Sequence, residues 1–121
     1  MNTGTKVLVV EDNPILLLDL CDQLAEFGYH PIPASTAATA ARLLDDTIAA
    51  LVTDIELGLG PDGLAIARLA AQIKPMPIVV VSGGVVPTRA DLPAQAVFLP
   101  KPYSVEDIVM ALDRQSMAQA A

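Results

Sequence analysis

The stretch KVLVVEDNP, at residues 6–14, decides the fold because it joins a buried strand to a helix through an acidic turn. After Lys6 its first part is entirely apolar, and β-branched residues dominate the run Lys6–Val10. Such a run predicts a short strand that is buried on both faces, as in a parallel sheet. Pro14 suits the first turn of a helix, where an amide hydrogen would lack a partner anyway. The stretch therefore predicts a strand, a loop and a helix in succession.

The same alternation of strand-like and helix-like segments continues along the chain. The further strands that we expect lie at 29–34, 49–54, 77–82 and 96–99. The helices that we expect lie at about 14–27, 36–46, 62–74 and 104–117. Pro87 and Pro93 leave room for only a short or irregular fourth helix within residues 83–95. Strands that alternate with helices in this way predict an α/β protein with a parallel sheet and helices on both faces.

The composition limits the size of the protein and its partners. The 121 residues, of which 53% are hydrophobic, suffice for one domain over residues 1–121, with an ordered core from about 5 to 117. The net charge of −7 argues against direct binding to nucleic acid, because proteins that bind it are normally basic. The single cysteine, Cys21, excludes an internal disulfide, and no apolar run reaches the length of a membrane span. We therefore expect a cytoplasmic protein that has no membrane partner.

Polar residues that could carry chemistry follow or end four of the expected strands. They are Glu11, Asp12, Asp54, Ser82 and Lys101. Ligands of an open parallel sheet bind at the carboxyl ends of the strands, so these five side chains belong to one edge. A flavodoxin-like, doubly wound (βα)5 sheet with strand order 2-1-3-4-5 places the first and third strands side by side. Glu11, Asp12 and Asp54 then share a pocket, where their mutual repulsion favours a bound cation and their hard oxygen ligands favour Mg²⁺.

Four motifs make the chain resemble a known family. They are VLVVEDNP at 7–14, LVTDIELG at 51–58, IVVVSGG at 78–84 and FLPKPYS at 98–104. Each motif is weak alone, but the four together, in this order, are specific and cover nearly the whole chain. The sequence resembles the receiver domains of two-component response regulators. The resemblance implies a signalling phosphoacceptor, not a classical enzyme, whose partner is a sensor histidine kinase or a histidine phosphotransfer protein in a phosphorelay.

The resemblance also implies a set of residues around the phosphoacceptor, Asp54. Asp12 and Asp54 are expected to ligate Mg²⁺ through their side chains, and Glu56 through its backbone carbonyl. Glu11 is expected to act on the metal through water. These assignments follow from the positions of the residues in the family motifs.

Three further residues take roles by the same resemblance. Ser82 is expected to hydrogen-bond an oxygen of the phosphoryl group and to move inward with it. Lys101 is expected to pair with Asp54 at rest and with the phosphoryl group afterwards, and its peptide bond to Pro102 is expected to be cis. Phe98 occupies the position of the aromatic switch, but it lacks the hydroxyl group that many relatives carry there, which excludes a hydrogen-bonded switch.

The first helix carries apolar residues on two sides. Placed at 100° per residue, Leu17, Leu20, Leu24 and Phe27 fall on one side, which is the expected core face. Ile15 and Leu18 lie among or beside acidic residues on the opposite side. Large apolar residues on a solvated face indicate a contact surface, although isolated exposed leucines are common. We therefore expect a partner to dock at Ile15 and Leu18.

Three other functions compete with a phosphoacceptor. A pseudo-receiver would bind partners without phosphorylation, but the intact set of Asp12, Asp54, Ser82 and Lys101 argues against it. A haloacid-dehalogenase-like phosphatase would need an Asp-x-Asp motif, which Asp54-Ile55-Glu56 lacks. A flavodoxin would need a Ser/Thr/Gly-rich phosphate loop after the first strand, where this chain has an acidic turn.

Overall fold

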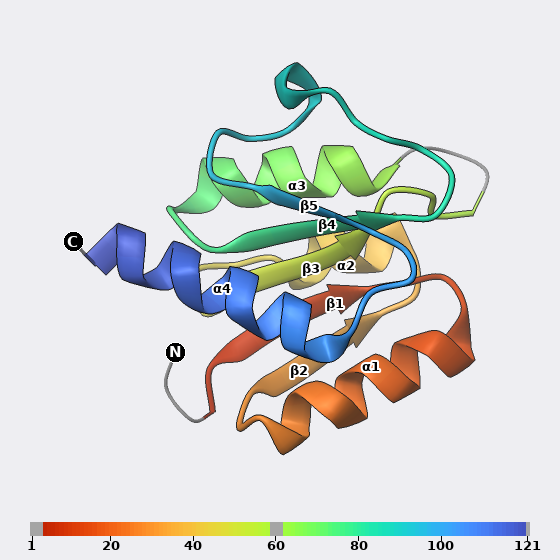
Figure 1. Ribbon diagram of the computed structural model, residues 1–121, viewed down its shortest axis with the longest axis horizontal. Coiled ribbons are helices and arrows are strands. Elements are labelled where there is room, and N and C mark those ends of the chain that lie inside the picture. The colour runs from red at the N-terminus through yellow and green to blue at the C-terminus, as the bar shows by residue number, and fades with distance from the viewer. Residues whose placement is uncertain (1–3, 59–61, 121) are drawn as a thin grey trace.

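A computed structural model describes residues 4–58 and 62–120, which form a five-stranded parallel sheet with helices on both faces (Figure 1). The strands are β1 Lys6–Val10, β2 His30–Ala34, β3 Ala50–Asp54, β4 Ile78–Ser82 and β5 Val97–Pro100. The helices are α1 Pro14–Glu26, α2 Ala37–Leu43, α3 Asp62–Ile73, α4 Val105–Ala120 and the short 3₁₀ helix η1 Arg89–Asp91. The strand order is β2-β1-β3-β4-β5, and every neighbouring pair is parallel. This topology confirms the predicted flavodoxin-like fold.

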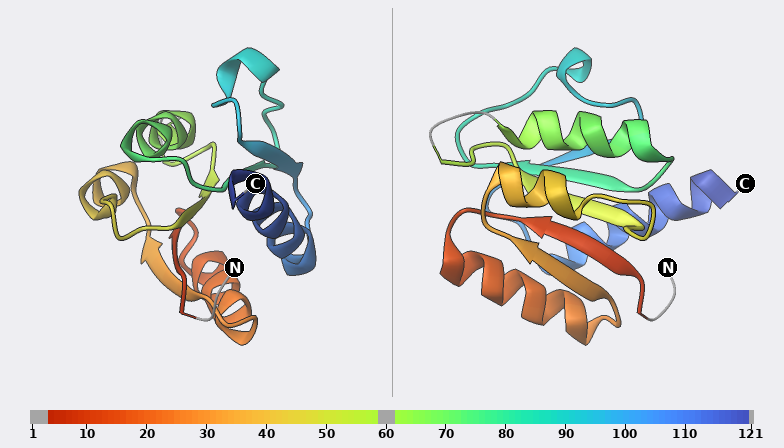
Figure 2. Two further views of the ribbon diagram at one scale, coloured as in Figure 1. Left: turned by 90° about the vertical axis from the view of Figure 1, so that its left-hand side faces the viewer. Right: turned by 180° about the vertical axis from the view of Figure 1, so that it is seen from behind.

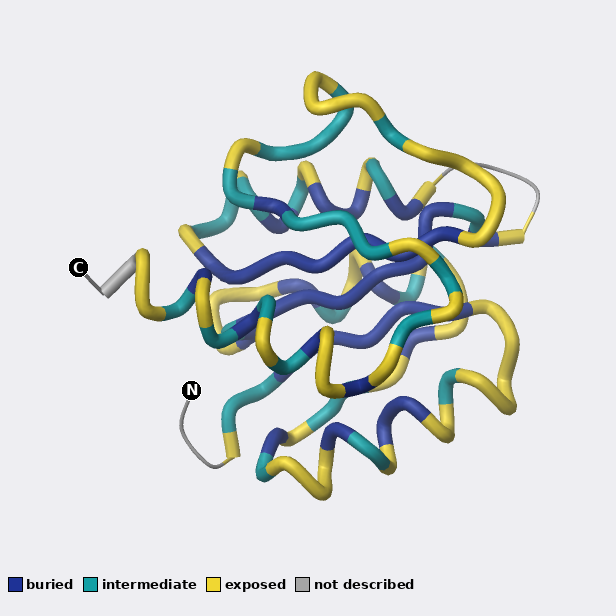
Figure 3. The backbone as a smooth tube through the Cα atoms, viewed as in Figure 1, coloured by how far each residue is buried: buried dark blue, intermediate teal, exposed yellow. Residues whose placement is uncertain are grey.

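The sheet divides the hydrophobic core into two halves, one beneath each helical layer (Figure 2). Helices α1 and α4 cover one face of the sheet, and α2 and α3 cover the other (Figure 1). Successive residues of a strand point to opposite faces, so Val7 and Val9 of β1 pack with α1 and α4, whereas Leu8 and Val10 pack with α2 and α3. Burial on both faces explains why the central strands have an apolar sequence without polar alternation (Figure 3).

The prolines of β2 are compatible with its place at the edge of the sheet. Pro31 and Pro33 lie opposite Val7 and Val9 of β1. Proline has no amide hydrogen to donate. An edge strand tolerates it because the strand has a hydrogen-bonded neighbour on one side only. This edge position agrees with the predicted strand order 2-1-3-4-5.

Side-chain caps fix where the helices begin. The Oδ1 atom of Asn13 accepts hydrogen bonds from the amides of Ile15 and Leu16 at 3.0 and 3.1 Å, which starts α1 directly after the acidic turn. At α4, the amide of Ser104 donates to the Asp107 carboxylate and the amide of Asp107 donates to the Ser104 hydroxyl, both at 3.2 Å. These two reciprocal bonds form a capping box.

Two helices end elsewhere than expected. α2 ends at Leu43, short of the predicted residue 46, because Asp45 Oδ1 accepts the amide of Thr47 at 2.8 Å and stabilises a turn instead. α4 continues beyond the predicted residue 117 to Ala120. Its 16 residues make it the longest helix, but no helix in the described part of the chain is both long and apolar enough to cross a membrane.

A buried amide side chain ties α4 to the sheet. Gln115 donates from Nε2 to the carbonyl of Ile78 at 3.0 Å and accepts the amide of Ile78 on Oε1 at 2.8 Å. The side chain thus satisfies both backbone groups at the start of β4, where pairing with β5 has not yet begun.

The expected core face of α1 is only partly buried. Leu20 and Leu24 are buried, and Leu17 packs at the margin of the core. Phe27, in contrast, is 47% exposed, which contradicts its predicted place on the core face. It is the C-cap residue, so the chain leaves the helical path there and the helical wheel no longer applies.

The segment between β4 and β5 contains only η1, which confirms the expectation of a short or irregular fourth helix. It arches away from the sheet beside α3 (Figure 2). The guanidinium group of Arg89 holds this arch together by donating to the carbonyls of Pro93, Ala94 and Ala96 at 2.7, 2.6 and 3.0 Å. Hydrogen bonds from one arginine side chain to backbone carbonyls therefore hold the segment between β4 and β5 in place of a regular helix.

The start of α3 packs against the end of β3 without any intervening side chain. The amide of Gly63 donates to the carbonyl of Ile55 at 3.1 Å. A Cβ atom at residue 63 would lie 1.7 Å from the carbonyl oxygen of Asp54. Glycine is required here because the obstacle is backbone, which cannot rotate away.

We predict that Gly63→Ala destabilises the fold by about 3 kcal/mol, because the added methyl group must separate α3 from β3. Gly83→Ala is the matched control, since its Cβ would meet the side chain of Lys101 at an ordinary 3.7 Å. We expect that variant to stay within about 0.5 kcal/mol of wild type. Urea unfolding measures both changes, and equal midpoints for the two variants would contradict the close packing at Gly63.

Candidate functional site

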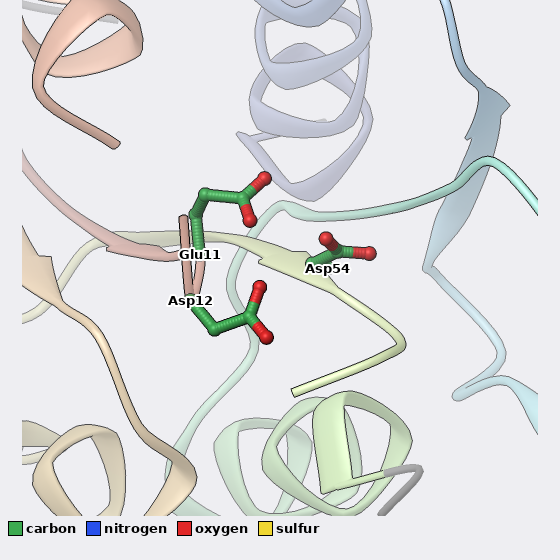
Figure 4. A group of neighbouring side chains, drawn as sticks. All are labelled: Glu11, Asp12 and Asp54. Carbon is green, nitrogen blue, oxygen red and sulfur yellow. The ribbon is translucent and has the colours of Figure 1, made fainter. Parts of the chain in front are cut away.

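Three carboxylates meet at the carboxyl edge of the sheet (Figure 4). Glu11 and Asp12 follow β1, and Asp54 ends its neighbour β3. One oxygen atom from each carboxylate lies within 4.8 Å of the others. Glu11 and Asp54 are buried, at 5% and 3% exposure, whereas Asp12 is open to solvent. The structure thus brings these three residues together as the sequence predicted.

A lysine from the loop after β5 enters this cluster. Lys101 Nζ lies 2.9 Å from Asp54 Oδ2 and 3.2 Å from Glu11 Oε1. Its backbone amide donates to the carbonyl of Ser82 at 2.9 Å, and its peptide bond to Pro102 is cis, as expected. The predicted pairing of Lys101 with Asp54 at rest is therefore present, while its role towards a phosphoryl group stays a prediction.

Burial and crowding oppose the ionisation of Asp54. Burial is the main cause that raises its pKa to about 6, and the nearby Glu11 and Glu56 add to the effect. Lys101 opposes the shift but does not cancel it. For Lys101 itself, burial acts against the charged form, but the hydrogen bonds and attraction to Asp54 and Glu11 outweigh it and raise the pKa.

Asp54 also has an oxygen atom without a protein partner. Its Oδ1 is buried and accepts no hydrogen bond from the described residues. Such an atom is unfavourable unless a ligand satisfies it. The oxygen is therefore available either to a cation or to a reacting group.

Asp12 completes a set of oxygen ligands at the open side of the cluster. Its Oδ2 accepts the amide of Gly58 at 2.9 Å, and this bond lowers the pKa of Asp12 despite some burial. The cluster contains three carboxylate groups, and Lys101 is the one cation that pairs with them among the described residues, so negative charge is in excess. Hard, charged oxygens beside solvent suit a hydrated Mg²⁺, so the residues present fit the metal that the sequence analysis expected.

The side chain of Glu56 makes contacts that the sequence analysis missed, because it assigned only the backbone carbonyl to the site. Ser82 Oγ donates to Glu56 Oε1 at 2.6 Å, and the amide of Val85 donates to the same oxygen at 3.2 Å. Burial alone would raise the pKa of Glu56, but the hydrogen bonds from Ser82 and its other partners outweigh burial and lower it. No pattern in the sequence predicts this contact, since residues 56 and 82 meet only through the pairing of β3 with β4.

The remaining predicted residues lie outside the acidic cluster. Phe98 is half-buried on β5, opposite Val80 of β4, and packs at the margin of the core on the side of α3. Ile15 and Leu18 are 78% and 64% exposed on α1, which starts immediately after the acidic turn. Their solvated position matches the prediction, but their roles as switch and docking residues remain predictions.

Comparison with solved structures shows what this architecture resembles. A response regulator receiver protein from Sinorhizobium medicae WSM419 is 32% identical in sequence, with a TM-score of 0.85 over 93% of this chain and 94% of that chain. A response regulator receiver domain protein from Clostridium thermocellum is 20% identical, with a TM-score of 0.79 over 96% and 97% of the two chains. The non-phosphorylated HemR receiver domain from Leptospira biflexa is 23% identical, with a TM-score of 0.78 over 93% and 94%.

The last two similarities show a shared fold, and the first also shows a related sequence. No family model matches the chain, and no curated protein does so either. The S. medicae protein determines the family assignment, because its alignment with this chain, at 32% sequence identity, covers more than nine-tenths of both chains. The chain belongs to the response regulator receiver family.

Proposed function

We propose that this receiver domain is the phosphoacceptor of a two-component or phosphorelay pathway, that Asp54 carries the phosphoryl group, and that Mg²⁺ is required. The observation that carries the proposal is the position of Asp54, which ends a buried strand among Glu11, Asp12 and Lys101 with Oδ1 free of partners. Its exposed neighbour Asp12 leaves the cluster accessible from solvent. The domain is a signalling module in this account, and the donor is a sensor histidine kinase or a histidine phosphotransfer protein.

Asp54 acts as the nucleophile. Its pKa of about 6 leaves the carboxylate mainly ionised at neutral pH, so no general base is needed. One carboxylate oxygen forms a bond to the phosphorus atom of a phosphohistidine. The phosphorus–nitrogen bond of the donor breaks, and the imidazole keeps the electron pair. The products are an acyl phosphate on Asp54 and a free histidine on the donor.

Positive charge and hydrogen-bond donors must stabilise the transferred group, because charge spreads over its equatorial oxygens. Lys101 lies within 2.9 Å of Asp54 and can follow the new phosphoryl oxygen. Ser82 supplies a hydroxyl donor at the end of the neighbouring strand β4. Asp12, Asp54 and the backbone carbonyl of Glu56 would hold Mg²⁺, with Glu11 acting through water. When bound, the ion would neutralise the remaining charge of the phosphoryl group.

Phosphorylation would change partner binding through β4, the neighbour of the strand that ends at Asp54, and through β5 beyond it. Ser82 moves towards the phosphoryl group in this account, and Phe98 on the adjacent β5 follows into the space that is vacated. Phe98 is only half-buried and its strand is an edge, so it can shift without disrupting the core. The downstream partner would then recognise the altered surface of β5.

The donor docks on α1 in this proposal. Ile15 and Leu18 present an exposed apolar surface that starts one turn beyond Asp12. A groove of about 500 Å³ lies between α1 and the loop after β5, and Leu16, Asp19 and Tyr103 contribute to its walls. A histidine-bearing helix bundle that covers this surface could present its phosphohistidine to Asp54.

We predict that acetyl phosphate with Mg²⁺ adds one phosphoryl group to the wild-type chain, because a small donor needs only the pocket. Asp54→Asn should abolish the addition, since no carboxylate remains to attack. Intact mass spectrometry with and without hydroxylamine, which cleaves acyl phosphates, measures both results. A hydroxylamine-sensitive phosphoryl group on Asp54→Asn would refute the assignment. An unmodified wild type would instead favour a constitutive binding module.

We predict that Ile15→Glu combined with Leu18→Glu slows transfer from a cognate phosphorylated donor by about tenfold or more, because charge is placed in an apolar contact. Phosphorylation by acetyl phosphate should be unchanged. Met117→Glu is the matched control, since it places a charge on an equally exposed residue of another helix, α4. Loss of both activities in the double variant would indicate damage to the fold, and loss of neither would place the docking surface elsewhere.

A further inference from the structure

We propose that the Glu56 carboxylate is an internal latch, which occupies the hydroxyl group of Ser82 at rest and must release it before a phosphoryl group on Asp54 can bind that hydroxyl. This inference rests on the proposed phosphoacceptor role of Asp54 and concerns how that role is regulated. It gives the side chain of Glu56 a function separate from that of its backbone carbonyl.

The latch is possible because the hydroxyl group of Ser82 has only one hydrogen to donate. Ser82 Oγ donates to Glu56 Oε1 at 2.6 Å, a short distance typical of a hydrogen bond to a charged acceptor. A serine hydroxyl can donate only once, so this bond excludes donation to a phosphoryl oxygen. Glu56 therefore competes directly with the phosphorylated Asp54 for the same hydrogen.

The latch also holds the start of the segment that follows β4. The amide of Val85 donates to Ser82 Oγ at 2.9 Å and to Glu56 Oε1 at 3.2 Å. The amide of Gly84 donates to Ser82 Oγ at 3.3 Å. Withdrawal of Glu56 removes one acceptor from Val85 and frees Ser82 to rotate. The same event that releases the hydroxyl therefore loosens the segment towards η1.

Charge repulsion is the competing explanation for any effect of Glu56. Its carboxylate adds a negative charge beside Asp54, which also disfavours an incoming phosphoryl group. Repulsion acts whether or not residue 82 carries a hydroxyl group, whereas the latch needs that hydroxyl. A double-mutant cycle on Glu56 and Ser82 separates the two.

The test measures the dissociation constant of beryllofluoride, a phosphoryl mimic, at saturating Mg²⁺ by calorimetry. The proteins are wild type, Glu56→Ala, Ser82→Ala and the double variant. We expect Glu56→Ala to bind beryllofluoride about tenfold more tightly than wild type, the factor that corresponds to one hydrogen bond to a charged group. In the Ser82→Ala background the same change should alter binding less than about twofold. Equal gains in both backgrounds would overturn the latch in favour of repulsion.

A second readout needs neither metal nor phosphoryl mimic. Hydrogen exchange of the Val85 amide in the metal-free protein should accelerate about tenfold in Glu56→Ala. It should accelerate less in Glu56→Gln, whose amide oxygen can still accept. The Asp91 amide, which donates to the carbonyl of Thr88 in η1, is the internal control and should not change. Unaltered exchange at Val85 would overturn the latch, whatever beryllofluoride does.

Failure of the proposed function gives a different result. If neither wild type nor Glu56→Ala binds beryllofluoride, Asp54 is not a phosphoacceptor and the latch has no role. If Glu56→Ala binds it but wild type and the double variant do not, the latch is supported in a stronger form, in which the resting state is closed to the ligand. Binding by the double variant as well would overturn the latch in favour of repulsion.

Discussion

The parallel pairing of β1 with β3 places the carboxylates of Glu11, Asp12 and Asp54 at one edge of the sheet, and their repulsion governs the site. The backbone holds them together, because the two strands are central and buried and cannot separate without loss of the core. Lys101 offsets part of the repulsion, but the pKa of Asp54 remains raised to about 6. The fold therefore stores an unfavourable charge arrangement that a cation or a phosphoryl transfer can use.

The surrounding structure accommodates this constraint. Asn13 starts α1 directly after the acidic turn, so the proposed docking surface begins beside the cluster. Gly63 lets α3 approach the end of β3, which fixes Asp54 in place. On the other side, Glu56 occupies the hydroxyl of Ser82 and so couples the cluster to the arch between β4 and β5. Each of these contacts lies beside the acidic cluster and limits how its side chains are placed.

Most of the fold was predictable because local patterns and long-range packing agree. Unbroken apolar runs predicted the buried strands, and strand order followed from the need to gather Glu11, Asp12 and Asp54. The end of α2 was not predictable, since it depends on competition from a turn at Asp45, and the exposure of Phe27 depends on where α1 ends. In the site, the positions of Glu11, Asp12, Asp54, Ser82 and Lys101 at or after strand ends predicted that they share one edge of the sheet. The Glu56–Ser82 contact was missed because side-chain direction after a strand has no sequence signature.

The most direct test compares unfolding free energies of wild type and Asp54→Asn without metal between pH 8 and pH 4.5. Asp54 has a pKa of about 6 in the folded chain against an ordinary 3.8, so the folded state binds more protons in this interval and its stability falls as pH rises through 6. We predict that the unfolding free energy of Asp54→Asn rises relative to that of wild type by about 2 kcal/mol between pH 4.5 and pH 8. We also predict that Mg²⁺ at pH 8 stabilises wild type far more than the variant. Parallel pH profiles and equal responses to Mg²⁺ would contradict the central role of the carboxylate cluster.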